Sequence, residues 1–267
     1  MVTKNIISVF TLNIGNTHAK LVAWSKGAIE ARFEWSTSEK NPKLGKWFGN
    51  SDAPVLIAGV VPAYKERLAA HVQKSGRRVL IFRRDVKPFL KIAPSPAAKV
   101  GDDRIAGALG ALFIKADRPW VTIDVGTAMT INAIRPGSAK KPPRFEGGLI
   151  VASATTSLRA LNQFTAQLPL FDNLKGSGSK SFLGRNTQEA MALGVWHAQI
   201  AAAITIAKGQ IRELGPRTLI ALTGGGAGGL DYSTEFRSAF PRRIYSIKEL
   251  VHLGLYSAWL QSGRKHG

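Results

Sequence analysis

One pattern that occurs twice constrains this chain more than any other feature. The segment "LNIGNTHAKLVA" at 12–23 is the end of an apolar strand, a turn of small residues and a second apolar strand. The segment "IDVGTAMTINAI" at 123–134 has the same order, and aligning the two places Asn13 on Asp124 and makes the turn glycines coincide. The repeat indicates an internal duplication, in which each half opens with a strand, a turn and a strand.

Strands and helices alternate along the remainder of the chain. Apolar strand patterns fall at 6–14, 18–25, 29–36, 54–61, 77–83, 120–134 and 218–223. Helical patterns fall at 63–76, 102–116, 155–168, 186–214 and 248–263. This alternation, with two similar openings, predicts an α/β fold made of two halves, which we place at residues 1–117 and 118–267.

Composition is that of a soluble globular protein. Hydrophobic residues make up 45% of the 267 residues and charged residues 20%, so a sizeable core is expected. The absence of Cys excludes disulfides and thiolate metal sites and fits a reducing compartment. The N-terminus lacks a signal-peptide pattern and no apolar run reaches about 18 residues, so we expect a cytoplasmic protein with no membrane span.

The net charge of +20 is unusual and favours anionic partners such as nucleotides, nucleic acids and acidic membranes. The basic residues occur in scattered pairs, for example Arg77–Arg78 and Lys140–Lys141, and form no long tail. We find no zinc-finger pattern, no aromatic strand pair and no basic helix that leads into heptads. A solvated basic surface is therefore favoured over nucleic-acid binding.

Glycine turns in the chain could hold phosphate groups, because glycine exposes backbone N–H groups and small hydroxyl residues add donors. Such turns are "GNT" at Gly15–Thr17, "GTAMT" at Gly126–Thr130 and "TGGGAGG" at Thr223–Gly229. Each alone also fits an ordinary hairpin, but two turns at one place in two halves are a stronger signal. None matches the P-loop or dinucleotide-binding pattern, which argues against those folds.

Carboxylates adjoin two of these regions. In "GDDR", Gly101–Arg104, a helix begins beside an Arg, which attracts anions, and a carboxylate there can accept a proton from a hydroxyl group. The alternative is that Asp102 caps the helix and Arg104 is solvated. Asp124 ends a buried strand and faces a glycine turn, a position that suits a cation or a phosphate-bound metal.

Seven motifs in this order resemble the type III pantothenate kinase family: "NIGNTHAK", "LIAGVVP", "GDDR", "DVGTAMT", "FEGGLI", "GRNTQEAMALG" and "LTGGGA". The resemblance runs from about Asn13 to Gly226. It implies the acetate kinase, sugar kinase, Hsp70 and actin superfamily, with two ribonuclease-H-like halves, an interdomain cleft and a homodimer. It also implies ATP-dependent phosphorylation of pantothenate, the first step of coenzyme A biosynthesis.

The resemblance further implies roles for single residues and for cofactors. ATP, with Mg²⁺, would contact Asn13, Gly15, Asn16, Thr17, Lys20 and Thr127. Pantothenate would contact Gly101, Asp102, Asp103, Arg104 and Thr187. Asp103 would be the catalytic proton acceptor, and Asp124 would bind a monovalent cation, K⁺ or NH₄⁺.

Two positions depart from the family pattern. Asn13 stands where the family has Asp, so the position keeps an oxygen but loses the charge that hard cations prefer. Pro94, seven residues before Gly101, stands where the family has Tyr. These departures leave a second interpretation open, a catalytically weakened or inactive homologue that acts as a nucleotide-binding regulatory factor.

Overall fold

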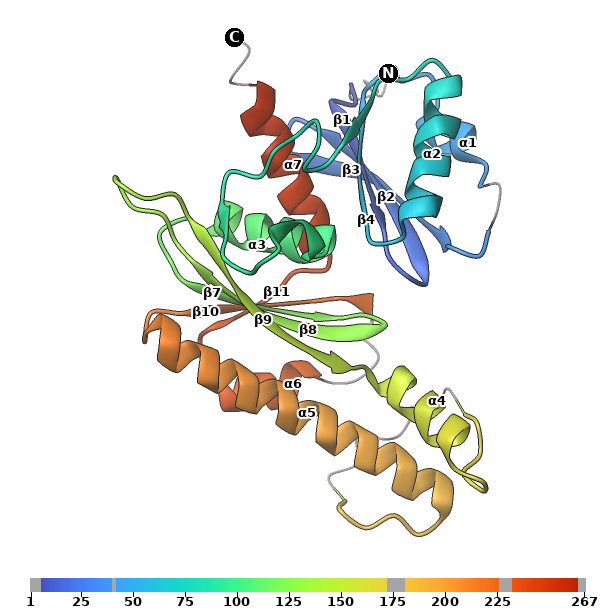
Figure 1. Cartoon of the computed structure of the whole chain (residues 1–267), viewed down its shortest axis with the longest axis vertical. Coiled ribbons are helices and arrows are strands. Elements are labelled where there is room, and N and C mark those ends of the chain that lie inside the picture. Colours follow the sequence, from blue (N-terminus) through green and yellow to red (C-terminus); the bar gives the residue numbers. More distant parts are fainter. Residues whose placement is uncertain (1–5, 40–41, 172–180, 226–231, 264–267) are drawn as a thin grey trace, which may run out of the picture. The chain divides into compact units, whose positions relative to one another are not determined.

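A computed structural model gives the fold and describes residues 6–39, 42–171, 181–225 and 232–263 (Figure 1). The chain divides into two units, each described separately below. Unit 1 consists of Met1–Ala116, Ala139–Pro143 and Leu250–Gly267, and unit 2 of Asp117–Ser138 and Arg144–Glu249. Both units contain a β-sheet and α-helices, which confirms the predicted α/β class.

Unit 1 has a five-stranded sheet in the order β3-β2-β1-β4-β5. Strands β2 and β3 are antiparallel to their neighbours, and β4 and β5 continue parallel to β1. The strands are β1 (Val9–Ile14), β2 (His18–Ser25), β3 (Ala28–Ser36), β4 (Val55–Gly59) and β5 (Val79–Ile81), and a short strand β6 (Lys91–Ile92) follows. The helices are α1 (Leu44–Phe48), α2 (Pro62–Lys74), the 3₁₀ turn η1 (Ala97–Lys99), α3 (Asp102–Ile114) and α7 (Leu250–Gly263).

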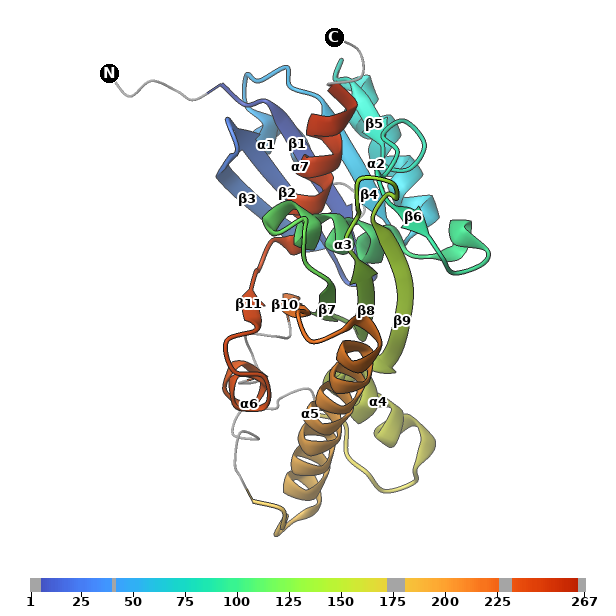
Figure 2. The ribbon, with the colours of Figure 1, turned by 90° about the vertical axis from the view of Figure 1, so that its left-hand side faces the viewer.

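Unit 2 contributes five strands to the second sheet, in the order β11-β10-β7-β8-β9. They are β7 (Trp120–Val125), β8 (Ala128–Arg135), β9 (Arg144–Ala152), β10 (Leu219–Thr223) and β11 (Ile244–Ser246). The helices are α4 (Ala154–Phe164), α5 (Thr187–Leu214) and α6 (Tyr232–Ala239). Figure 2 shows α5 running beside this sheet, and its buried side chains join those of β7 and β10 in one apolar core.

The two sheets repeat one topology. In each, the first strand pairs antiparallel with the second and the second with the third, and the first also pairs parallel with a later strand. The order β3-β2-β1-β4-β5 therefore corresponds to β9-β8-β7-β10-β11. This correspondence confirms the duplication that the repeated turn predicts.

Helix α7 belongs to unit 1, whereas the predicted boundaries place residues 250–267 in the second half. The reason is its contact with α3 and β2. The Tyr256 ring stacks on the Trp24 ring with centroids 4.4 Å apart, and a Cβ on Gly254 would overlap the Ala106 carbonyl. The last helix of the sequence therefore completes the core of the first unit.

A buried polar chain also ties α7 to β1. The Trp24 indole donates to the Thr11 hydroxyl at 2.9 Å, and this hydroxyl lies 2.9 Å from Nδ1 of His252. Burial, with a smaller effect of the positive charge on Lys20, lowers the pKa of His252 to about 3. His252 is therefore a neutral structural partner at physiological pH and not an acid–base group.

Helix α5 is long and apolar enough to cross a membrane by length and composition, which the sequence analysis did not predict. Within unit 2, however, Met191, Val195, Ile200 and Ala203 are buried in the core. A core helix of a soluble protein passes the same test of length and hydropathy, so this is only a weak indication of a membrane span.

The closeness of α3 and α7 gives a test of the fold. We expect Gly254→Ala to lower the free energy of unfolding by about 3 kcal/mol or more, because the added methyl group would overlap the Ala106 carbonyl and the two helices would have to separate. Urea unfolding followed by circular dichroism measures this. Gly263→Ala in the same helix is the control, since no atom lies within 4 Å of its added Cβ. Equal stabilities of the two variants would contradict the packing.

Candidate active site

The first predicted phosphate turn joins β1 to β2. The Gly15 N–H donates to the His18 carbonyl at 2.9 Å, and a Cβ on Gly15 would lie only 3.1 Å from that oxygen. The Thr37 hydroxyl donates to the Asn16 carbonyl at 2.6 Å and so fixes the turn from the end of β3. The side chains of Asn16 and Thr17 are exposed. The turn is therefore tight in its backbone and open to solvent on its side-chain surface.

Asn13 lies one residue before the end of β1, directly opposite Lys20 of β2. Its Oδ1 atom is buried and has no hydrogen-bond partner among the described residues. Nζ of Lys20 lies 3.6 Å from Oε1 of Glu34. A buried acceptor without a donor usually marks a place for water, an ion or a ligand.

The end of β4 connects this turn to the "GDDR" segment. Gly59 pairs with Ile14, and a Cβ on Gly59 would lie 2.6 Å from the Ile14 Cβ. On its other side, the Gly59 N–H donates to Oδ2 of Asp102 at 3.2 Å. Unit 1 thus brings together two sequence motifs that are about 90 residues apart, at the carboxyl ends of β1 and β4.

Asp103 lies in the first turn of α3, where helix N–H groups and the helix dipole favour a negative charge. Its Oδ1 accepts from the Arg104 N–H at 2.8 Å. Burial nevertheless raises the pKa of the Asp103 carboxyl, because desolvation outweighs this hydrogen bond and the positive charge of Arg104. The pKa of Arg104 is lowered by burial, which the Asp103 charge partly offsets. Asp103 is therefore a stronger proton acceptor than an exposed Asp.

Gly101 makes room for this carboxylate. A Cβ at position 101 would lie 2.5 Å from Oδ1 of Asp103 and 3.4 Å from Cγ1 of Val60. A larger residue here would have to displace the Asp103 side chain or the end of β4. The motif therefore has glycine at this position because any side chain would collide with the Asp103 carboxylate.

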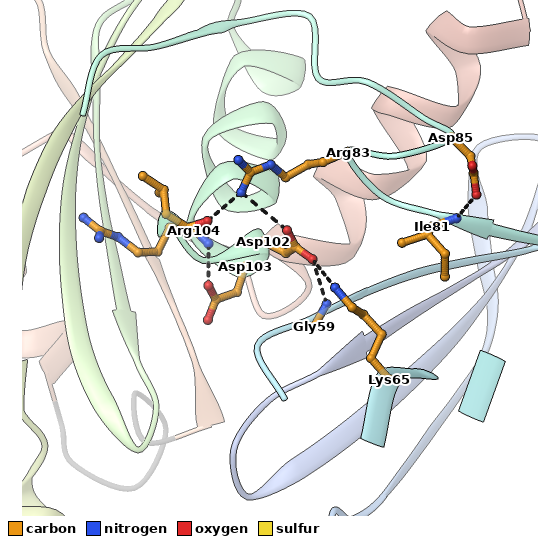
Figure 3. A network of polar contacts seen from close by, with 9 residues as sticks. Gly59, Lys65, Ile81, Arg83, Asp85, Asp102, Asp103 and Arg104 are labelled. Carbon is orange, nitrogen blue, oxygen red and sulfur yellow. Dashed lines mark hydrogen bonds and ion pairs between the residues drawn. The ribbon is translucent and has the colours of Figure 1, made fainter. Parts of the chain in front are cut away.

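The Asp102 carboxylate is engaged by protein donors, as Figure 3 shows. Oδ2 accepts from Nζ of Lys65 at 3.2 Å as well as from Gly59, and Oδ1 lies 3.6 Å from Nη1 of Arg83. The alternative interpretation, in which Asp102 caps the helix and Arg104 is solvated, is wrong. The N-cap of α3 is Gly101, and Arg104 is partly buried. The Asp102 side chain instead contacts β4, α2 and the loop after β5.

Unit 2 presents Asp124 one residue before the end of β7. It lies opposite Thr130 on β8 and next to Thr223 on β10. A Cβ on Gly224 would lie 2.6 Å from Oδ1 of Asp124, so a side chain at this position, where φ is +101°, would collide with the carboxylate. Among the residues that the structure describes, no group of three or more His, Cys, Asp or Glu side chains surrounds a common point.

The turn after β7 carries Thr127, whose side chain is exposed. The Thr156 hydroxyl donates to the Thr127 carbonyl at 2.6 Å, and the Thr156 N–H donates to Ser153, the N-cap of α4. The N-terminus of α4 is therefore fixed beside the second predicted phosphate turn. Helix N-termini stabilise anions, which makes this turn a suitable phosphate neighbour.

Thr187 is exposed at the first position of α5, whose N-cap is Asn186. Thr187 belongs to unit 2, whereas "GDDR" belongs to unit 1. The third glycine turn is described only as far as residue 225, so most of "TGGGAGG" lies outside the described residues. A pocket of about 590 Å³ in unit 2 is lined by α4 and α5 and by none of the predicted site residues.

Sequence reasoning missed three residues of the candidate site. Lys65 was predicted only as part of a helix, and Gly59 and Arg83 only as parts of strands. Pairs separated by 37 residues, such as Lys65 and Asp102, leave no local pattern in a single sequence. Gly59 did leave a signal, since it directly follows the apolar run Val55–Ala58.

Comparison with known proteins identifies relatives along most of the chain. A family model described as type III pantothenate kinase matches residues 9–209. The type III pantothenate kinase of Sphingopyxis alaskensis is 26% identical over 232 residues, which cover 81% of this chain and 86% of that protein. The type III pantothenate kinase of Legionella pneumophila (strain Corby) is 29% identical over 231 residues, with 81% and 87% covered.

Solved structures agree on the fold. MreB5 of Spiroplasma citri, bound to AMPPNP, has a TM-score of 0.54 at 12% identity, with 97% of this chain and 98% of that chain covered. The activator of 2-hydroxyisocaproyl-CoA dehydratase from Clostridium difficile, with bound ADPNP, has a TM-score of 0.53 at 14% identity, with 97% and 98% covered. At such identities the likeness concerns the fold alone, and it confirms the predicted actin-like ATPase class.

The raised pKa of Asp103 predicts a gain of stability when its charge is removed. The folded state binds this proton more tightly than the unfolded chain, so the favourable contribution is complete below the unfolded-state pKa and is lost as pH rises through the folded-state pKa. We expect Asp103→Asn to unfold at higher urea concentration than the unsubstituted protein near pH 8. The difference should shrink as pH falls towards about 4.

Asp85→Asn is the matched control with the opposite sign. The pKa of Asp85 is lowered by its hydrogen bond with Arg84 and by that with the Ile81 N–H, so its ionised form is favoured in the folded protein. This substitution should lower stability near pH 8, or leave it unchanged, and never raise it. A destabilised Asp103→Asn protein near pH 8 would contradict the assignment of Asp103 as a desolvated carboxylate.

Proposed function

Because the chain belongs to the type III pantothenate kinase family, we propose that it transfers the γ-phosphoryl group of ATP to the primary hydroxyl of pantothenate, giving 4'-phosphopantothenate for coenzyme A biosynthesis. The observation that carries the proposal is Asp103. It is a desolvated carboxylate with a raised pKa, it lies at a helix N-terminus, and it stands in the motif that matches the family. A kinase that acts on an alcohol needs a proton acceptor of this kind near the attacking oxygen.

In the proposed reaction, Asp103 accepts the proton of the substrate hydroxyl as its oxygen attacks the phosphoryl group. Gly101 supports this role because it leaves the Asp103 carboxylate unobstructed on the side of β4. Arg104, the next residue on α3, holds the substrate carboxylate as its counter-ion. Phosphoryl transfer depends on positioning and charge neutralisation, so these residues contribute orientation and proton transfer and form no covalent bond.

The two glycine turns are the proposed phosphate contacts. Gly15, Asn16 and Thr17 form a tight turn with exposed side chains, and Lys20 on the following strand supplies a positive charge. Thr127 occupies the equivalent turn of unit 2, beside the capped N-terminus of α4. Backbone N–H groups at such turns and helix starts suit phosphate oxygens, which supports the use of ATP.

Two cations belong to the proposal. The buried Oδ1 of Asn13, which has no partner among the described residues, suits a water molecule of bound Mg²⁺ or the ion itself, although an amide holds hard cations less strongly than a carboxylate. We assign Asp124 to K⁺ or NH₄⁺ because it is a carboxylate near the end of a strand in the family motif, with Gly224 packed beside its Oδ1. When bound, these ions neutralise phosphate charge, while the chain supplies the oxygen ligands that hold them.

A homodimer in the cytoplasm completes the proposal. Leu149 and Ile150 on β9 are 55% and 61% exposed, and Phe164 at the end of α4 is 79% exposed. Exposed apolar groups of this size favour contact with a second copy of the chain. We assign Thr187, exposed at the start of α5, to the substrate pocket on the strength of the family motif alone.

Pantothenate-dependent release of ADP tests the proposal. With Mg²⁺ and saturating ATP, we expect ADP only when pantothenate is present, and faster release in potassium than in sodium buffer. Asp103→Asn should lower kcat by roughly 10²- to 10⁴-fold, the usual contribution of general acid–base catalysis. No turnover by the unsubstituted protein or by Asn13→Asp would overturn the kinase proposal and leave the regulatory alternative, which the family match does not support.

Asn13→Asp tests the magnesium position with a readout besides activity. A buried carboxylate is costly to desolvate, and Lys20 opposite it is already paired with Glu34, so the variant should melt at lower temperature than the unsubstituted protein in EDTA. Added Mg²⁺ should raise its melting temperature more than that of the unsubstituted protein, and should also raise the turnover rate. An identical Mg²⁺ response in both proteins would place the metal elsewhere.

A further inference from the structure

Asp102 is a buried residue with no part in the proposed chemistry, and yet it makes more polar contacts than its neighbour Asp103. It is 9% exposed, and its two oxygens lie against three elements of unit 1. The contacts are the Gly59 N–H at 3.2 Å, Nζ of Lys65 at 3.2 Å and Nη1 of Arg83 at 3.6 Å (Figure 3). Such partners compensate the charge of a buried carboxylate, and removing them would leave that charge uncompensated.

Arg83 extends the network to the segment that precedes α3. Its guanidinium donates to the Val100 carbonyl at 2.6 Å and to the Ala97 carbonyl at 2.7 Å. Through Arg83, Asp102 is therefore coupled to the chain on the N-terminal side of Gly101. Through Gly59 and Lys65 it is coupled to the end of β4 and to α2. The first turn of α3 is held from three directions by one carboxylate.

We propose that Asp102 is a positioning residue for Asp103, and that Asp102, Lys65 and Arg83 form an ion triad that fixes the first turn of α3 and sets the charge around the proton acceptor. The proposal rests on the proposed function in one respect only, namely that Asp103 is the proton acceptor of the kinase reaction. The triad is a property of unit 1, and it can be tested whether or not the protein phosphorylates pantothenate.

The charges of the triad act on Asp103 with opposite signs. Asp102 raises the pKa of Asp103 by repulsion, after the larger effect of burial, and Arg104 lowers it. Lys65 on α2 and Arg83 after β5 are cations beside Asp102, and so oppose its effect. On α7, which packs against α3, His252 is neutral at physiological pH and adds no charge. The balance between Asp102 and the two cations therefore tunes the basicity of Asp103.

Two substitutions should shift the titration of Asp103 in opposite directions. Asp102→Asn removes the repelling charge and leaves two cations unbalanced, so the acidic limb of the kcat/KM profile should move to lower pH. Lys65→Met removes a cation but keeps the apolar stem, so the limb should move to higher pH. A residue that only stabilises the fold would give no such pair of opposite shifts.

Asp102→Asn should also displace the first turn of α3, because an amide cannot replace the carboxylate that accepts hydrogen bonds from the Gly59 N–H and from Lys65. We expect Asp102→Asn to lower kcat by roughly 10- to 100-fold at the pH optimum, with a smaller change in KM. Asp85→Asn is the matched control, because Asp85 bonds to Arg84 and Ile81, and among the described residues no hydrogen bond or ion pair joins it to the triad. It should leave both the profile and kcat unchanged.

The same titration can be followed without turnover, by ¹³C NMR of the aspartate carboxyls with Asp103→Asn to assign the signal. The Asp103 signal should titrate at lower pH in Asp102→Asn and at higher pH in Lys65→Met than in the unsubstituted protein. Shifts of equal sign, or none, would overturn the triad even in an active enzyme. Opposite shifts in a protein that releases no ADP would support the triad and overturn only the kinase proposal. If Asp102→Asn does not fold, the direction of the Lys65→Met shift decides.

Discussion

The close approach of parallel strand ends is the constraint on which the rest of the structure depends. In unit 1, β4 ends at Gly59, where a Cβ would lie 2.6 Å from the Ile14 Cβ. In unit 2, β10 is followed by Gly224, where a Cβ would lie 2.5 Å from the Val125 nitrogen. Ile14 and Val125 are equivalent in the repeat, so the duplication has kept a contact between strands as well as a turn. The strands can approach so closely because glycine has no side chain at these contacts. Asn13 and Asp124 lie beside them, each one residue before the end of its strand.

The adjacent carboxylates of "GDDR" show how position decides the role of a side chain. Asp102 meets two cations and a backbone N–H, so its charge is balanced within unit 1. Asp103, one residue later and about 100° around the helix, accepts a hydrogen bond from the Arg104 N–H, and desolvation has the largest effect on its pKa. One residue is therefore suited to hold the helix start in place, and the other to accept a proton.

The sequence predicted the features that depend on local pattern. The repeated strand, turn and strand identified the two halves, and the apolar runs identified strands β1 to β5, β7, β8 and β10 and helices α2 to α5 and α7. Strands β9 and β11 and helices α1 and α6 were not predicted. The allocation of α7 to unit 1 could not be predicted, because it depends on the packing of Gly254 against α3 and of Tyr256 against Trp24. For the same reason Lys65 and Arg83 were missed: ion pairs across many residues are set by the fold and leave no periodic signal.

The two halves differ in charge at equivalent positions, and the difference suits the proposed reaction. Asp124 lies opposite Thr130, which carries no charge. Asn13 faces Lys20, and an Asp at this position would compete with Glu34 for the charge of that lysine. With an amide at position 13, the Lys20 ammonium is neutralised less and can attract phosphate more strongly, at the expense of affinity for a divalent cation. Unit 1 would then bind the polyphosphate mainly through a positive side chain, and unit 2 would contribute the charged ligand for the ion.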